Sequence, residues 1–177
     1  MAAAKVSGSS VLVLMGVSGS GKSTVAQTLV KRLEWDLAEG DDMHPAANIA
    51  KMRAGRPLDD EDRRPWLTTV AAWIREHTAS GRPGVVTCSA LKRDYRDVLR
   101  GPHVVFVHLA AGRDEIARRM SGRRVHYMPS ALLDSQLDAL EPPADDENAI
   151  TIDVGGTPDE AAAEIIERLD LSLPTRR

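Results

Sequence analysis

The segment VLVLMGVSGSGKST, residues 11–24, places five apolar residues directly before the pattern G-x-x-x-x-G-K-[ST]. The apolar run predicts a buried β-strand, and Val25, Leu29 and Leu33 follow at the spacing of an amphipathic helix. A strand, a glycine-rich loop and a helix in this order form a cradle whose backbone N–H groups point at phosphate oxygens. We therefore predict an α/β protein that binds a nucleoside triphosphate at this loop.

Each residue type in the loop has its own chemical task. Glycine lets the backbone approach the phosphates closely, and Lys22 supplies a positive charge between the terminal phosphates. The Ser23 hydroxyl suits the coordination shell of Mg²⁺, and the positive end of the helix dipole faces the anion. The predicted nucleotide-binding residues of the loop are Gly16, Ser18, Gly19, Ser20, Gly21, Lys22, Ser23 and Thr24.

Length and charge limit the classes of function. A chain of 177 residues fits one domain, and a formal net charge of -3 gives no electrostatic footprint for nucleic acid or an acidic membrane. The sequence shows no signal peptide and no apolar run long enough to cross a bilayer, so we expect a soluble cytoplasmic protein. The single cysteine, Cys88, excludes an internal disulfide and follows an apolar strand, which predicts a buried side chain without chemistry.

Short apolar runs alternate with helical patterns along the chain, which is typical of a parallel sheet with helical crossovers. This predicts a three-layer α/β sandwich with a five-stranded parallel sheet. Pro65 and Pro158 suit first-turn positions of helices, and residues 141–148 suggest an exposed loop. The expected strands are 11–15, 35–39, 85–88, 104–109 and 150–154, and the expected helices are 22–33, 65–79, 93–99, 113–120 and 158–169.

Two segments, 40–66 and 121–143, do not fit this alternation. Ligands of open parallel sheets bind beyond the carboxyl ends of the strands, so segments that leave those ends can cover the nucleotide or hold its acceptor. We expect both segments to act in this way.

The first of these segments opens with candidate catalytic groups. Asp41 could orient an acceptor hydroxyl and take its proton, but a capping or turn role before Pro45 is equally compatible with the residues. Glu39 could hold the water shell of Mg²⁺. His44 could hydrogen-bond a substrate hydroxyl or simply stabilise the turn.

Three longer stretches of sequence are far more specific for one protein family than the phosphate-loop pattern is. GDDMHPAANIAKMRAGRPLDDEDRRPWL (40–67) closely resembles the substrate-domain motif of the gluconokinase family, G-D-x-x-H-P-x-x-N-x-x-K-M-x-x-G-x-P-L-x-D-x-D-R-x-P-W-L. The stretches CSALKRDYRDVLR (88–100) and RRVHYMPSALLDSQLDALEPP (123–143) also resemble segments of that family.

The resemblance implies an enzyme that uses ATP and Mg²⁺ to phosphorylate the 6-hydroxyl of D-gluconate, giving 6-phosphogluconate and ADP. It also implies a P-loop NTPase fold like that of nucleoside monophosphate kinases, and it suggests a homodimer. By this likeness the core comprises 8–39, 80–120 and 144–171, the substrate-binding insertion 40–79, and the lid 121–143.

A gluconate site needs cations for the carboxylate and many hydrogen-bond partners for the hydroxyls. Lys92 and Arg96 lie four apart on an expected helix and share a face. Arginine can grip a carboxylate with two hydrogen bonds, so Arg96 is the first candidate for the anchor, followed by Lys92 and Lys51. The spacing alone is more typical of a solvated helix face whose cations pair with neighbouring aspartates. Only the resemblance to the family motif favours a gluconate site.

Two arginines, one within the second segment and one just before it, also resemble functional residues of the family. Arg123 matches the lid arginine that stabilises charge on the transferring phosphoryl group, and Arg119 matches one that flanks the nucleotide. A basic amphipathic helix without ligand contacts is the alternative for both. Trp66, Leu67, Trp73 and Gln136 are expected to serve the architecture only.

Other classes fit less well. A shikimate kinase or a nucleoside monophosphate kinase would share the phosphate loop, but the glycine triplet of the former and a base pocket for the latter are not evident. A GTPase switch would carry D-x-x-G and N-K-x-D motifs, which do not occur at the expected positions. A regulatory ATP-binding module without chemistry stays open.

Overall fold

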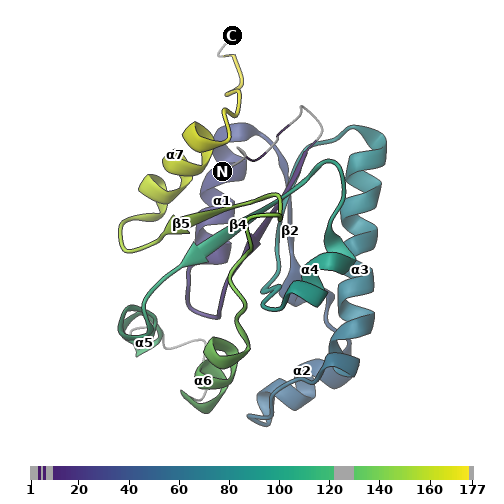
Figure 1. Ribbon diagram of the computed structural model, residues 1–177, viewed down its shortest axis with the longest axis vertical. Helices are drawn as coiled ribbons and strands as arrows, with labels where there is room; N and C mark the ends of the chain where they lie inside the picture. Colours follow the sequence, from purple (N-terminus) through teal and green to yellow (C-terminus); the bar gives the residue numbers. More distant parts are fainter. Residues whose placement is uncertain (1–3, 5, 7–9, 122–129, 176–177) are drawn as a thin grey trace.

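Parallel strands build one sheet in a computed structural model that describes residues 4, 6, 10–121 and 130–175 (Figure 1). The sheet order is β2-β3-β1-β4-β5, and every pair of neighbours is parallel. The phosphate loop therefore leaves the central strand. The strands are β1 (Val11–Met15), β2 (Asp36–Glu39), β3 (Gly84–Thr87), β4 (Val104–Ala110) and β5 (Ala149–Asp153).

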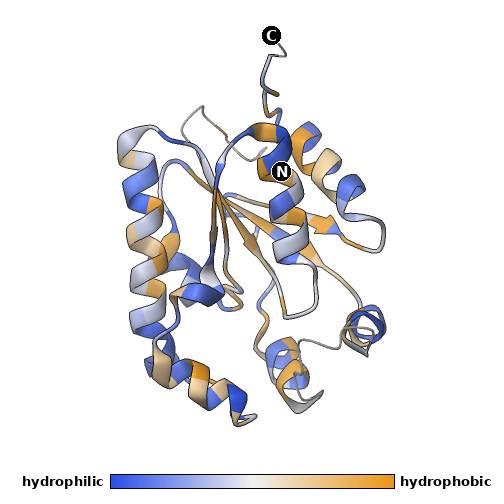
Figure 2. Cartoon of the chain, turned by 180° about the vertical axis from the view of Figure 1, so that it is seen from behind, coloured by the Kyte–Doolittle hydropathy of each residue, from blue (hydrophilic) through white to orange (hydrophobic). Residues whose placement is uncertain are grey.

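Helices cover both faces of the sheet, as the sequence predicts. One face packs against α1 (Lys22–Leu33) and α7 (Pro158–Arg168), and the other against α3 (Asp60–Ser80) and α4 (Arg93–Leu99) (Figure 1). Leu12 and Leu14 point to the first layer, and the alternate residues of β1 point to the second. Because both faces are buried, β1 is apolar throughout, and Figure 2 shows hydrophobic residues concentrated along the strands. The three-layer α/β sandwich is confirmed.

Helix α3 begins earlier than the sequence pattern predicts. Its N-cap is Asp59, whose side chain accepts from the Asp62 N–H while the Asp62 side chain accepts from the Asp59 N–H. This capping box starts the helix at Asp60, so the prediction that Pro65 occupies the first turn is wrong. At α7 the corresponding prediction is confirmed, since Thr157 is the N-cap and Pro158 follows it.

The remaining elements gather at the carboxyl edge of the sheet (Figure 1). After β2 the chain forms the 3-10 helix η1 (Gly40–Met43) and α2 (Ala46–Arg53), which the strand-helix alternation did not predict. After β4 it forms α5 (Arg113–Ser121) and then α6 (Ser130–Ala139). Residues 122–129 of the expected lid lie outside the described residues.

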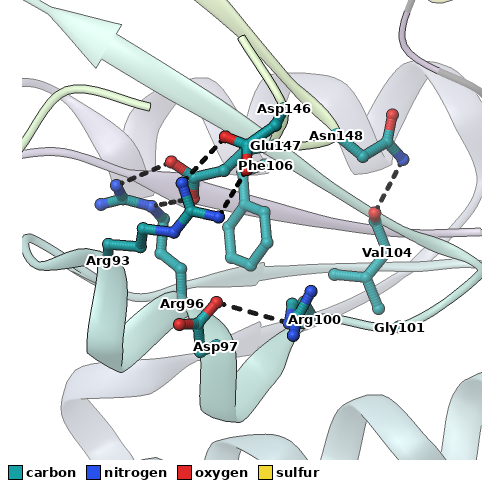
Figure 3. Close-up of a pocket in the computed structure, with 10 residues that line it drawn as sticks. All are labelled: Arg93, Arg96, Asp97, Arg100, Gly101, Val104, Phe106, Asp146, Glu147 and Asn148. Carbon is teal, nitrogen blue, oxygen red and sulfur yellow. Dashed lines mark hydrogen bonds and ion pairs between the residues drawn. The ribbon is translucent and has the colours of Figure 1, made fainter. Parts of the chain in front are cut away.

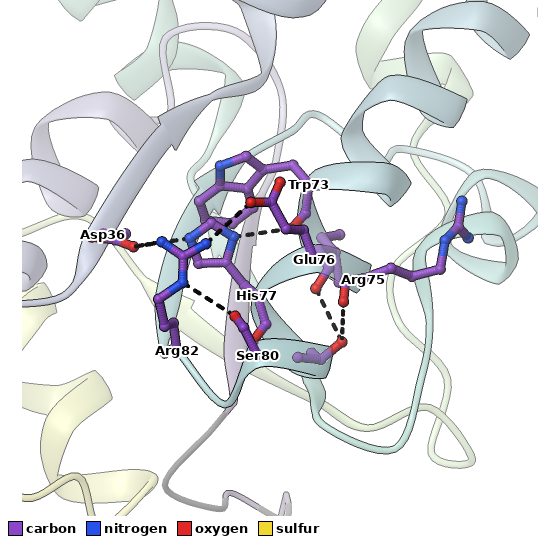
Figure 4. Close-up of polar contacts among 9 residues, drawn as sticks. Asp36, Trp73, Arg75, Glu76, His77, Ser80 and Arg82 are labelled. Atoms are coloured by element: carbon purple, nitrogen blue, oxygen red, sulfur yellow. Dashed lines mark hydrogen bonds and ion pairs between the residues drawn. The ribbon is translucent and has the colours of Figure 1, made fainter.

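A polar contact ties the end of α3 to the start of β2, at the edge opposite the loop. The His77 ring lies 3.0 Å from the Trp73 carbonyl oxygen through Nδ1 and 3.0 Å from the Asp36 carboxylate through Nε2 (Figure 4). Trp73 stacks on the same ring, with centroids 3.8 Å apart. Trp73 therefore has the architectural place expected for it.

Loop 141–148 is fixed to α4 by two arginines (Figure 3). Arg96 donates from Nε and Nη2 to the Glu147 carboxylate at 2.6 and 3.0 Å, and both side chains are buried, with 1% and 9% exposed. Arg93 donates two hydrogen bonds to Asp146 nearer the surface. These residues line a cavity of about 400 Å³ beside α4. Most of the loop is exposed, as its composition predicts, and the Glu147 side chain anchors it to the core.

Removal of the Glu147 charge should destabilise the protein. Breaking one side of a buried ion pair costs about 3 kcal/mol or more, because the guanidinium of Arg96 keeps its charge without a partner. We expect Glu147→Gln to lower the free energy of unfolding by this amount at pH 7 in urea titrations. Asp146→Asn, which touches the exposed pair in the same loop, should leave the unfolding midpoint near that of the parent.

The pH dependence follows from the same pair. Burial raises the pKa of Glu147, but hydrogen bonds from Arg96 and from the Ala144 N–H outweigh burial and hold the pKa below its usual range. The pair therefore stabilises the fold above the ordinary pKa of a glutamate, and this contribution is lost as the pH falls through the lower folded-state pKa. The difference between parent and Glu147→Gln should shrink in acid; a difference independent of pH would contradict this assignment.

Candidate functional site

The phosphate loop sits in a tight space at the end of β1. Gly16 has φ +144°, and a Cβ there would lie 2.8 Å from the Leu109 carbonyl oxygen of β4. Gly21 has φ +93° and is the N-cap of α1, so the amino terminus of this helix opens onto the loop. Both positions need glycine, since other residues rarely adopt this backbone. The predicted anion cradle therefore has the required backbone shape.

Lys22 reaches back over the loop. Its Nζ donates to the carbonyl oxygens of Gly16 and Val17 at 2.9 and 3.0 Å. Desolvation lowers the pKa of Lys22, and the carboxylates of Asp41 and Glu39 act in the opposite direction. A partly buried ammonium group that burial destabilises is well suited to meet an anion.

A cavity of about 260 Å³ adjoins the loop on the side of α7. Arg119 lies beside this cavity, where its Nη1 donates to the Ser20 carbonyl oxygen at 3.3 Å and its Nη2 donates to that of Val154. Arg119 thus lies near the loop with backbone carbonyl groups as its partners, and its contact with a nucleotide stays a prediction. The lining residues are Ser20, Gly21, Thr24, Val25, Arg119, Val154, Gly156, Thr157, Pro158 and Ala161.

The two residues predicted to serve Mg²⁺ lie together. The Ser23 hydroxyl donates to Glu39 Oε2 at 2.9 Å, and the Thr87 hydroxyl of β3 donates to the same oxygen at 2.5 Å. Sequence analysis missed Thr87, whose place opposite Glu39 follows only from the pairing of β2 with β3. In the part of the chain that the structure describes, no group of three or more His, Cys, Asp or Glu side chains could hold a metal. One hydroxyl and one carboxylate fit Mg²⁺, which usually takes few protein ligands and completes its shell with phosphates and water.

Asp41 follows a closely packed glycine. A Cβ on Gly40 would lie 2.1 Å from the Thr87 carbonyl oxygen, and Trp66 Nε1 donates to the Gly40 carbonyl oxygen at 2.7 Å. These contacts fix η1 at the end of β2 and leave Asp41 exposed. The Asp41 carboxylate acts electrostatically on both Lys22 and His44. Asp41 is therefore close to the charge of Lys22, and its acid-base role stays a prediction.

His44 is held in a defined orientation beside Asp41. Its ring stacks on Trp66 with centroids 4.1 Å apart, and Asn48 Nδ2 lies 3.2 Å from its Nδ1. Burial lowers the pKa of His44. Because the amide nitrogen can only donate, Nδ1 is the acceptor, and the neutral ring carries its proton on Nε2. His44 thus has one N–H donor for a substrate hydroxyl.

The acidic start of α3 pairs with the candidate cations of the substrate segment. Lys51 Nζ lies 2.6 Å from Asp62, and Lys92 Nζ lies 3.3 Å from Asp60. Tyr95 donates to Asp60, and the guanidinium of Arg63 lies 5.4 Å from the Tyr95 ring centroid. Arg63 was missed, although the D-x-D-R part of the motif contains it.

Arg96 requires a correction. The sequence suggested that it points into the cleft with Lys92, but its guanidinium is buried against Glu147 and its Nη1 donates to the Ala90 carbonyl oxygen at 2.9 Å. Neutralisation by Glu147 removes the free charge that a carboxylate anchor needs. Arg96 has a structural place under the loop after β3. Arg123, the predicted lid arginine, lies outside the described residues.

Comparison with known proteins agrees with this geometry. A family model described as an AAA domain matches residues 11–143. A gluconokinase of Gluconobacter oxydans strain 621H is 49% identical over 157 residues, which cover 88% of each chain. The chain belongs to the gluconokinase family. Among solved structures, a gluconokinase from Sinorhizobium meliloti 1021 has a TM-score of 0.83 and 42% identity and covers 91% of both chains.

A second solved structure, an unliganded sugar kinase from Janibacter sp. HTCC2649, has a TM-score of 0.87 and 44% identity over 92% of this chain and 95% of that one. Membership in the gluconokinase family confirms the fold class and the family resemblance of the three motif stretches. Among the described residues, no helix has the length and apolar character needed to span a membrane.

Cys88 lies beneath the site and should be inert. Desolvation raises the pKa of its thiol to about 12, so almost no thiolate exists at pH 8. We expect the native protein to resist a thiol reagent at this pH and the urea-unfolded protein to react with one equivalent per chain, since the sequence has a single cysteine. Rapid modification of the native protein would show that Cys88 is accessible.

Proposed function

We propose that this protein transfers the γ-phosphoryl group of ATP to the 6-hydroxyl of D-gluconate, forming 6-phosphogluconate and ADP. One observation carries the proposal: the Asp41 carboxylate lies near enough to Lys22 to act on its charge, at the carboxyl edge of the sheet in a member of the gluconokinase family. The alternative, another small-molecule kinase of this fold, has no specific support, because the likeness to an APS kinase at 18% identity concerns the fold alone.

The position of the phosphate loop determines where ATP would bind in the site. The nucleoside would occupy the cavity beside Gly156 and Pro158, and the phosphates would run along the loop toward Lys22. Mg²⁺ would be held by the Ser23 hydroxyl, with Glu39 holding its water shell, and would neutralise charge on the phosphates. This chain's own contribution is to orient the phosphates through backbone N–H groups and the charge of Lys22.

The residues of η1 and the segment after it determine where gluconate would bind in the site. The Asp41 carboxylate would accept a hydrogen bond from the 6-hydroxyl of gluconate and take its proton as the new P–O bond forms. His44 Nε2 would donate to a neighbouring hydroxyl. For the gluconate carboxylate, Lys92 and Arg63, which both lie near the Tyr95 ring, replace Arg96 as the best candidates. Lys51 of α2 is the third candidate.

The remaining predicted roles belong to Arg123 of the lid and to Arg119 of α5. Arg123 would stabilise charge on the transferring phosphoryl group, and Arg119 would contact the nucleotide from its place beside the cavity. Homodimeric assembly and a cytoplasmic location stay predictions from the sequence and the family.

The acceptor is tested directly by steady-state kinetics. In a coupled assay with ATP and Mg²⁺, we expect turnover with D-gluconate and formation of 6-phosphogluconate. Shikimate, a nucleoside monophosphate and a reaction without acceptor serve as controls and should show at most background ADP formation. Brisk turnover of a control acceptor with none of gluconate would overturn the proposed function.

Asp41→Asn tests the acid-base role. The near-isosteric amide keeps the shape but cannot accept the proton, so we expect turnover with gluconate to fall by ~10² or more while ATP binding is kept. Asp42→Asn, at the adjacent exposed position, is the matched control and should retain activity. Parent-like turnover in Asp41→Asn would favour catalysis by positioning alone.

A further inference from the structure

Helix α6 places a glutamine side chain directly on the phosphate loop. The Ser18 N–H donates to Gln136 Oε1 at 2.7 Å, and Gln136 Nε2 lies 3.3 Å from Ser18 Oγ. The orientation of the amide is fixed by chemistry, because a backbone N–H can donate only to the oxygen end. Residues 118 positions apart in the sequence are thereby joined at the third residue of the loop.

The peptide group that Gln136 contacts is the one that holds Lys22. The carbonyl oxygen of Val17 accepts from Lys22 Nζ at 3.0 Å, and the N–H of the same peptide unit belongs to Ser18. In a planar trans peptide the C=O and N–H point in opposite directions. The peptide is therefore gripped from both sides, and a rotation that released Gln136 would also turn the carbonyl away from Lys22.

The position of α6 is set by contacts other than this amide. Leu133 is buried with Val17, Leu91 and Ile116 in one apolar cluster. The Glu141 N–H, just after the helix, donates to the Leu91 carbonyl oxygen at 2.8 Å. Arg113 of α5 pairs with Asp134 of α6. These contacts position α6, and the hydrogen bond of Gln136 follows from the place of the helix.

We propose that Gln136 is a positioning residue that fixes the Val17–Ser18 peptide and, through the Val17 carbonyl, the ammonium group of Lys22. Its effect on catalysis rests on the proposed function, but its effect on nucleotide binding does not. A charge that is held in place before the phosphates arrive costs no reorganisation when they bind or react. Docking of α6 therefore preorganises the loop for the terminal phosphates of ATP.

Gln136→Met tests this role because it keeps the length and packing of the side chain but removes the acceptor oxygen. We expect kcat/KM for ATP to fall about tenfold, since small misplacement of a phosphate-binding group slows transfer. In direct titrations, ATP binding should weaken about fivefold, the effect of losing one hydrogen bond. AMP binding should not change, because AMP carries no terminal phosphates for Lys22 to contact.

The AMP titration also reports whether the variant folds and keeps its nucleoside pocket. Asp138→Ala, an exposed position on the same helix, is the matched control and should behave like the parent in every assay. Equal weakening of ATP and AMP binding, or parent-like kinetics and ATP binding, would overturn the proposal. If the parent does not phosphorylate gluconate but Gln136→Met still weakens ATP selectively, the proposed acceptor fails and the role of Gln136 stands.

Discussion

The contact of Lys22 with the carbonyl oxygens of Gly16 and Val17 is the constraint on which the site depends. It fixes one positive charge at the carboxyl end of the central strand, β1. The carboxyl ends of β2, β3 and β4 lie at the same edge of the sheet. A partly buried cation there would be costly without neighbours, and Asp41 and Glu39 supply compensating charge. In the proposed function, the anion, the metal and the acceptor would therefore be arranged around this ammonium group.

The acceptor side shows a second electrostatic feature. Its cations are already paired in the absence of ligand, Lys51 with Asp62 and Lys92 with Asp60, and these acids also belong to the first turn of α3. A substrate carboxylate would have to compete with Asp60 for Lys92. The acidic turn therefore both starts the helix and keeps the cations oriented. Such competition would lower affinity while holding the cations in place, which suits an enzyme that must release its product.

Local patterns were sufficient to predict much of the fold. The segment from β1 to α1 was predicted with its observed bounds, because five buried residues, the glycines of the loop and helical spacing all indicate the same structure. The start of α3 was missed because Pro65 is a strong local signal for a first turn. The reciprocal hydrogen bonds of Asp59 and Asp62 that actually start the helix depend on geometry that spacing alone does not reveal.

The roles of some residues depend on contacts with residues far away in the sequence, which the sequence alone could not predict. Arg96 looked like a ligand anchor until Glu147, 51 positions away, proved to neutralise it. Gln136 looked architectural, yet its amide reaches a peptide of the phosphate loop. By contrast, the structure brings Ser23 and Glu39 together, because the loop after β1 and the last residue of β2 lie at the same edge of the sheet.

A crystal structure with gluconate, Mg²⁺ and a nonhydrolysable ATP analogue would show whether Lys22 and Asp41 act as proposed. We expect the triphosphate in the loop with Lys22 on its terminal phosphates, and the gluconate 6-hydroxyl within hydrogen-bond distance of Asp41 and in line with the γ-phosphorus. Gluconate bound away from Asp41, or a triphosphate that does not contact Lys22, would contradict these proposed roles.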